Sequence, residues 1–76
     1  MTKTTLDELS EGAEAELISV DGLPGLRRRL MEMGLLPGTR VRLIRRLERG
    51  GVLELEVRRS RLSLRHEDAS HLTVGR

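Results

Sequence analysis

The chain has 76 residues, enough for one domain with a small core, because a domain of this size buries only about 60% of its unfolded surface. Its 37% hydrophobic content includes no Phe, Tyr or Trp, so the core must be aliphatic, and the absence of Cys excludes disulfides, thiolate metal sites and a Cys nucleophile. The net charge of +2 is unevenly distributed: residues 1–26 hold six acids and one Lys, net −5, whereas residues 27–76 hold thirteen Arg and six acids, net +7.

The first predicted elements are a short helical turn and a strand. In TTLDELSEG, Thr5 and Glu8 have the spacing of a capping box, which indicates a capped turn. In AEAELISV, residues 13–20, apolar residues alternate with acids, and a period of two predicts a strand. DGLPG, residues 21–25, has the composition of a turn.

A helix is predicted next, followed closely by a strand. Apolar residues recur at spacings of three, four and three and would share one helix face: Leu23, Leu26, Leu30 and Met33. Gly34 is placed to end the helix in a left-handed conformation. Pro37-Gly38 is the pair favoured at the centre of a type II turn, so the chain should reverse there into a strand.

The rest of the chain predicts a series of short strands. Residues 39–47 would turn Val41, Leu43 and Leu47 to the core and Arg40, Arg42, Ile44 and Arg46 to solvent. A hairpin turn at 48–51 precedes two strands with the same alternation, through VLELEVR and RSRLSLR. HEDA, residues 66–69, predicts one helical turn, and residues 71–74 a last strand. We expect one mainly β domain over residues 1–76, a small barrel of about five strands with one inserted short α-helix, because closure removes edge strands.

Catalytic chemistry is poorly represented. The chain shows no nucleophile elbow and no phosphate-binding glycine loop, so we expect a protein that is not an enzyme. The one candidate metal cluster is HEDASH, in which His66 and His71 with the neighbouring acids would suit Fe(II) or Zn. Their spacing of five does not stack both rings on one helix face, and the alternative is two unrelated exposed histidines.

The Arg excess leaves several classes of partner open. It suits nucleic acid, an anionic membrane surface or an acidic protein, or it forms a solvated face. Small nucleic-acid-binding barrels usually stack bases on aromatic rings, which this chain lacks, so nucleic acid is not favoured. There is no apolar run of the length of a membrane span and no signal peptide, so we expect a cytoplasmic protein without direct membrane insertion. An exposed sheet edge or helix face could form a homo-oligomer.

The order of motifs resembles the ferrous iron transport protein A (FeoA) family over about 70 residues. The resemblance is carried by LDELSEG, AELISV, RRRLMEMGLLPGTRVRLIRR, GGVLELEVR and RLSLRHEDASHLTV. It implies an SH3-like barrel interrupted by a helix. It also implies a small accessory protein that supports or regulates Fe(II) uptake by the membrane transporter FeoB, which has a cytoplasmic GTPase domain. A similar barrel ends the iron-dependent repressors of the diphtheria toxin regulator type, so the alternative is a metal-responsive regulatory module acting with a transcription factor or nucleic acid.

For docking on the FeoB GTPase region, the helix and the strand after it are the candidate surface. The contact candidates are Arg27, Arg28, Arg29, Leu30, Met33, Arg40 and Arg42. We expect helix and strand to present one composite surface, with Arg46 sharing the face of Arg40 and Arg42. The alternatives are that Leu30 packs in the core and that the Arg side chains of the strand are exposed to solvent without a binding role.

The turn VRRSRLSL departs from the family pattern. Similar proteins often have Gly or Asn near Arg59 and an aromatic residue near Ser60. If a left-handed residue is needed there, Arg59 would carry strain of about 1 kcal/mol or more. A binding role assigned to an aromatic residue at Ser60 does not transfer to this chain.

Overall fold

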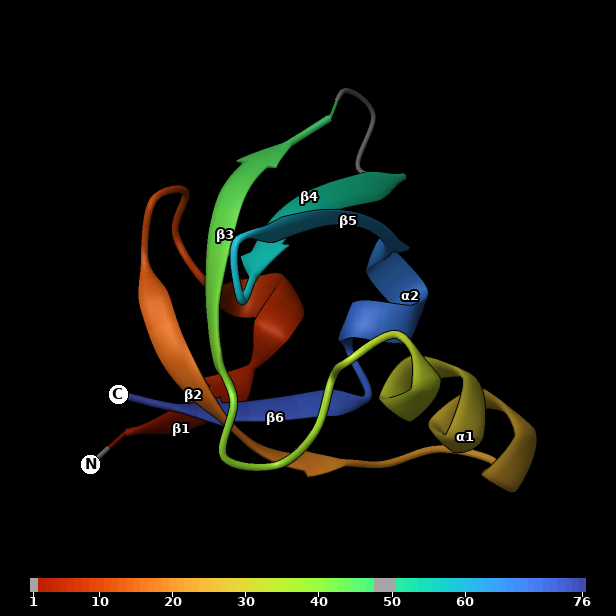
Figure 1. Ribbon diagram of the computed structural model, residues 1–76. Helices are drawn as coiled ribbons and strands as arrows, with labels where there is room; N and C mark the ends of the chain where they lie inside the picture. The colour runs from red at the N-terminus through yellow and green to blue at the C-terminus, as the bar shows by residue number, and fades with distance from the viewer. Residues whose placement is uncertain (1, 48–50) are drawn as a thin grey trace.

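The computed structural model describes residues 2–47 and 51–76 and arranges them around one antiparallel sheet (Figure 1). Within these residues the sheet has six strands in the order β1-β6-β2-β3-β4-β5. Their bounds are β1 Lys3–Thr5, β2 Glu14–Val20, β3 Arg40–Arg46, β4 Val52–Val57, β5 Ser60–Arg65 and β6 Leu72–Gly75. The predicted turn at 48–51 lies mostly outside the described residues.

The predicted mainly β fold with an inserted short helix is confirmed, but the sheet does not close into a barrel. The short first strand, Lys3–Thr5, was not foreseen, and it pairs with β6 rather than closing the sheet against β5. The sheet is therefore open, with β1 and β5 as its edges. The 3-10 turn η1 (Leu6–Glu8) and helix α2 (His66–Ala69) pack against each other on the concave side of the curled sheet, where they cover the core (Figure 1).

The helices follow the sequence patterns with one exception. Helix α1 spans Pro24–Glu32, and α2 is the single turn expected from HEDA. Thr5 precedes η1, but its side chain makes no capping hydrogen bond, so the capping box is not formed. A three-residue 3-10 turn is too short to present the reciprocal bonds of that motif. No helix in the described parts of the chain is long and apolar enough to span a bilayer.

The junction between α1 and β3 is fixed by two turns of the backbone. Gly34 has φ +101°, its N–H donates to Met31 O at 3.0 Å, and the Leu35 N–H donates to Leu30 O at 3.2 Å. These two bonds make the helix C-terminus that glycine permits, and Leu30 and Leu35 are both buried beneath it. Gly38 has φ +93° and the Thr39 N–H donates to Leu36 O at 3.0 Å, as expected of a type II turn.

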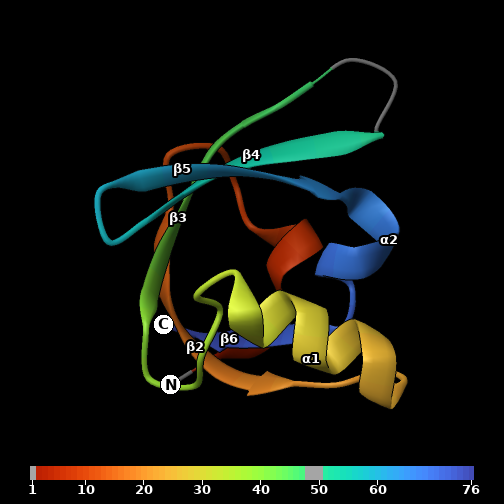
Figure 2. The same cartoon turned by 45° about the vertical axis from the view of Figure 1, so that its right-hand side comes forward.

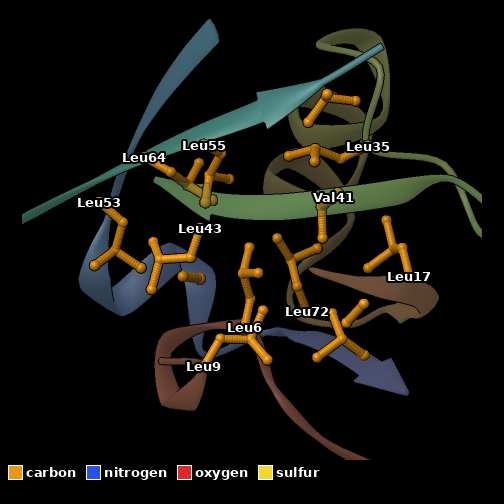
Figure 3. Packing of buried hydrophobic residues seen from close by; sticks show 14 of the residues in the cluster. Leu6, Leu9, Leu17, Leu35, Val41, Leu43, Leu53, Leu55, Leu64 and Leu72 are labelled. Atoms are coloured by element: carbon orange, nitrogen blue, oxygen red, sulfur yellow. The ribbon is translucent and has the colours of Figure 1, made fainter. Parts of the chain in front are cut away.

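The core is aliphatic, as the composition requires (Figure 3). Inward-facing strand residues meet η1 and α2, and α1 itself contributes a single buried residue, Leu30. Full burial of a Leu or Val side chain stabilises a fold by about 1.5–3 kcal/mol. The ten largest side chains that are fully buried are Leu6, Leu17, Leu30, Leu35, Leu43, Leu53, Leu55, Leu72, Val41 and Val74.

Two irregularities in the sheet shift which residues face the core. In β3, Leu43 lies opposite Leu55 but Arg45 lies opposite Glu54, so Ile44 is an extra residue. Arg46 is then opposite Leu53 on the core side and is half-buried. The prediction that Arg46 shares the outer face with Arg40 and Arg42 is therefore wrong, and Arg45 takes that place. Register also shifts in β2 between Leu17 and Ser19.

Candidate interaction surface

Helix α1 presents its outer face to solvent at one side of the molecule (Figure 2). Pro24, Arg27, Arg28 and Met31 stand at positions i, i+3, i+4 and i+7, which share one helix face. With Glu32 they line a hollow of about 430 Å³. Just before the helix, the side chain of Leu23 is 78% exposed, the most exposed large apolar residue described. We use the term α1 surface for the residues that line this hollow together with the exposed apolar residues at the two ends of the helix, Leu23 and Met33.

The apolar candidates on α1 divide between core and surface. Leu30 is 1% exposed and belongs to the core, so its side chain is not available for contact with a partner. Met33 is 37% exposed and stays a candidate. Leu23 was expected on the core-facing stripe, but α1 begins only at Pro24, and the extended backbone at Leu23 turns its side chain outward. Met31, which lies off that stripe, packs partly against the core.

The three consecutive Arg residues of α1 have different surroundings. Arg27 Nε donates to Val20 O at 3.1 Å, and Arg29 Nη2 lies 3.7 Å from Asp68 Oδ2. These contacts hold α1 against the end of β2 and against α2. Arg28 makes no hydrogen bond or ion pair within residues 2–47 and 51–76. Arg28 is therefore the cation of the α1 surface that is available to a partner.

Arg40 and Arg42 lie on the outer face of β3 and form a separate surface. They line a hollow of about 600 Å³ with residues of β2 and with Gly75 and Arg76. Arg42 Nη2 is 2.8 Å from Glu56 Oε1, and Arg40 Nη2 is 3.9 Å from Glu14 Oε1. This hollow shares no residue with the hollow on α1, so the two groups of Arg residues line separate hollows, and the predicted composite surface stays a prediction. The carboxylates already balance much of the charge on the strand.

The two histidines lie in different surroundings. His66 Nε2 is 3.4 Å from Asp7 Oδ2, and Asp7 is 8% exposed, with an Oδ1 atom that is buried without a described hydrogen-bond partner. His71 instead lies beside Gly22 and Leu26, because a Cβ on Gly22 would be 3.3 Å from the His71 Cγ. Among the described residues, no group of three or more His, Cys, Asp or Glu could hold a metal ion. The contact between Asp7 and His66 joins residues far apart in the sequence, so no sequence motif predicted it.

Comparison with known proteins identifies the family and the fold. The FeoA domain model matches residues 4–76, and no curated protein matches the chain. Two solved structures resemble the chain. An FeoA-like protein from Clostridium acetobutylicum is 28% identical, with a TM-score of 0.89 over 99% of this chain and 88% of that one. Stenotrophomonas maltophilia FeoA complexed with zinc, described as a prokaryotic SH3 domain protein, is 33% identical, with a TM-score of 0.83 over 95% of this chain and 89% of that one.

A third likeness concerns the fold alone. A manganese-dependent transcriptional repressor is 18% identical, with a TM-score of 0.87 over 95% of this chain but only 40% of the repressor. The same fold thus occurs as a small protein and as a part of a larger one. The family model covers nearly the whole sequence, from residue 4 to the last residue, and the chain belongs to the FeoA family.

Proposed function

We propose that this chain is a non-enzymatic accessory protein of ferrous iron uptake, acting in the cytoplasm by docking on the GTPase region of the transporter FeoB. Membership of the FeoA family supports the pathway. The Stenotrophomonas maltophilia relative is described as a candidate ferrous iron transport activating factor, which agrees with an accessory role. The FeoB partner follows from the resemblance that the motifs carry.

The α1 surface is the proposed docking site. The observation that carries the proposal is the hollow that Arg28 lines with Pro24 and Met31, because Arg28 makes no hydrogen bond or ion pair among the described residues. Protein interfaces combine apolar anchors with a polar rim, and Arg is enriched at them. Leu23 and Met33 would supply the anchors, and Arg28 the rim charge. Arg40 and Arg42 are weaker candidates, because both are already within 4 Å of a carboxylate in the chain.

The docking is tested by measuring binding to the FeoB cytoplasmic GTPase domain near physiological salt. Arg28→Glu is expected to weaken binding by about tenfold, which corresponds to 1.4 kcal/mol, and Leu23→Ala by a similar factor. Both residues are exposed, so neither variant should unfold the chain. The matched control is Lys3→Glu, the same charge reversal on exposed β1 at the sheet edge.

Two results would contradict the docking site. One is an absence of binding by the unmodified chain. The other is equal loss of binding in Arg28→Glu and Lys3→Glu, which would mean that net charge rather than the α1 surface decides affinity. If Arg40→Glu alone weakens binding, the outer face of β3 is the docking site.

We also propose weak binding of Fe(II) or Zn at His66 or His71, because the Stenotrophomonas maltophilia relative was solved with zinc. Imidazole and carboxylate suit both ions, and the two histidines lie apart, so each would need ligands from elsewhere. Anaerobic titration with each metal of the unmodified chain and of the variants His66→Ala and His71→Ala shows which histidine binds it. The absence of a saturable site, or a site unchanged by both substitutions, would refute this proposal.

A regulatory role with a transcription factor or nucleic acid is less well supported. Its structural basis is the likeness to metal-dependent repressors, which concerns the fold alone. Binding of labelled DNA or RNA with a steep loss of affinity as salt rises would favour it.

A further inference from the structure

Strand β5 has a free edge that the sheet leaves unpaired. Its residues pair with β4 on one side, from Val52 opposite Arg65 to Val57 opposite Ser60. Within residues 2–47 and 51–76 no strand pairs with its other side. An edge strand offers a row of backbone N–H and C=O groups that can hydrogen-bond to an added strand.

The outer face of the sheet carries a row of alternating charges that ends on this edge. Glu14 of β2 lies opposite Arg42, Arg42 opposite Glu56, and Glu56 opposite Arg61 of β5. A second row runs from Arg45 to Glu54 to Ser63. Directly opposed opposite charges stabilise a sheet and like charges destabilise it. The next strand in this pattern would therefore place an acidic residue beside Arg61.

Arg61 differs from the other basic residues of the row. Arg42 and Arg45 contact Glu56 and Glu54 at 2.8 and 3.0 Å. Arg61 is exposed, and among the described residues it makes no ion pair. Arg65, four residues on, is also exposed and lies 3.9 Å from Glu67, which is itself exposed. The edge thus presents two cations on one face, Arg61 without an ion pair among the described residues and Arg65 with a distant one.

The inner face of β5 favours an apolar neighbour. Leu64 is buried, but Leu62 is only partly buried while packing against the core. An apolar side chain on an added strand would cover Leu62. The added segment would then alternate acidic residues on the outer face with apolar residues on the inner face.

A second copy of β5 does not meet these requirements. In antiparallel pairing of two β5 strands centred on Ser63, Arg61 of each would lie opposite Arg65 of the other. Such like-charge pairs are destabilising. Self-pairing of the edge in this register is therefore disfavoured.

We propose that the β5 edge binds an extended segment of a partner protein, in which acidic and apolar residues alternate, as an added strand of the sheet. This binding is independent of docking through α1, because the two surfaces lie on different elements and share no residue. Backbone hydrogen bonds would supply affinity, and the contact of acids with Arg61 and Arg65 would select the segment.

The experiment uses a dye-labelled peptide of sequence EVEVEVE, whose binding to the full chain is followed by fluorescence anisotropy. One control is the basic peptide KVKVKVK. The others are two forms of EVEVEVE with N-methyl groups on alternate residues, one form for each of the two sets of alternate residues, so that each form blocks the N–H groups of one edge. Amide NMR of the chain should place the perturbations in β5 rather than in α1 or at the other edge, β1. Arg61→Gln should weaken binding about 1.4- to 5-fold, the range of one cross-strand charge pair. Lys3→Gln is the matched control.

The outcomes separate the proposal from its alternatives. We expect acidic-peptide binding that one N-methylated register abolishes and KVKVKVK does not reproduce. Equal binding of KVKVKVK, or tolerance of both N-methylated registers, would overturn strand addition with acidic selection. Perturbations confined to α1 or β1, or no binding at millimolar peptide, would also overturn it.

Discussion

Arg46 joins two distant segments of the chain. Its guanidinium donates to Leu9 O and its backbone N–H donates to Glu11 Oε2 at 2.7 Å, which fixes the loop after η1 against β3. Arg46→Ala should lower the free energy of unfolding by about 1–2 kcal/mol, because a half-buried hydrogen bond from a charged group is lost. Denaturant unfolding followed by far-ultraviolet circular dichroism measures this, since the chain has no Trp or Tyr. The exposed Arg40→Ala should change stability by less than about 0.5 kcal/mol, and an equal loss in both would contradict the structural role of Arg46.

Arg59 occupies a backbone conformation that disfavours its side chain. The turn between β4 and β5 has two central residues, Arg58 with φ +50° and Arg59 with φ +71°, as in a type I′ hairpin that prefers Asn-Gly. The predicted left-handed position is thus confirmed. Arg59→Gly should raise the free energy of unfolding by about 1 kcal/mol, the strain relieved less the added flexibility of the unfolded chain. Arg59→Ala removes the same charge but keeps Cβ and should gain much less, so equal effects would show that charge decides.

At the scale of the element, one glycine within α1 and one just after it should respond oppositely to the same substitution. Gly34 has φ +101° after the helix, whereas Gly25 lies within it, and nothing lies within 4 Å of a Cβ added at either. Gly34→Ala should destabilise the chain by about 1 kcal/mol through backbone strain alone. Gly25→Ala should stabilise it by up to about 1 kcal/mol, because Ala has the higher helix propensity. Thermal or denaturant unfolding of both variants measures the pair, and the same sign in both would refute this assignment of the cap.

Sequence periodicity predicted most elements but not the details that place the site. Alternation of apolar and charged residues located β2 to β5. The turns predicted at Gly34 and Pro37-Gly38 were confirmed by positive φ angles at Gly34 and Gly38. The short strand β1 has no apolar residue, so it carries no such signal. An extra residue in a strand, as at Ile44, leaves no mark in composition, which is why Arg46 was assigned to the wrong face.

The candidate site was only partly predictable for a related reason. Helical spacing identified the core stripe, and Leu30 is indeed its buried member. The exposure of Leu23 depends on where α1 begins, and helix boundaries are the least certain part of a sequence reading. Which of three consecutive Arg residues is unpaired depends on β2 and α2, whose positions only the tertiary structure provides.

For the molecule as a whole, charge is matched internally on the sheet, whereas each proposed binding surface carries a cation without an ion pair among the described residues. Rows of Arg and Glu neutralise one another across the middle strands, whereas Arg28 on α1 and Arg61 on β5 make no described ion pair. The net charge of +2 is therefore less informative than its location. Both proposed partners would bring acidic residues, one to a helix face and one to a sheet edge.

Docking through α1 is tested most directly by the methyl signals of methionine. The chain has three Met residues, Met1, Met31 and Met33, and the last two belong to the α1 region. With 13C-labelled methionine methyl groups, addition of the unlabelled FeoB GTPase domain should shift or broaden the Met31 and Met33 signals and leave Met1 unchanged. Unchanged Met31 and Met33 signals at saturating GTPase domain, or a change confined to Met1, would contradict docking through α1.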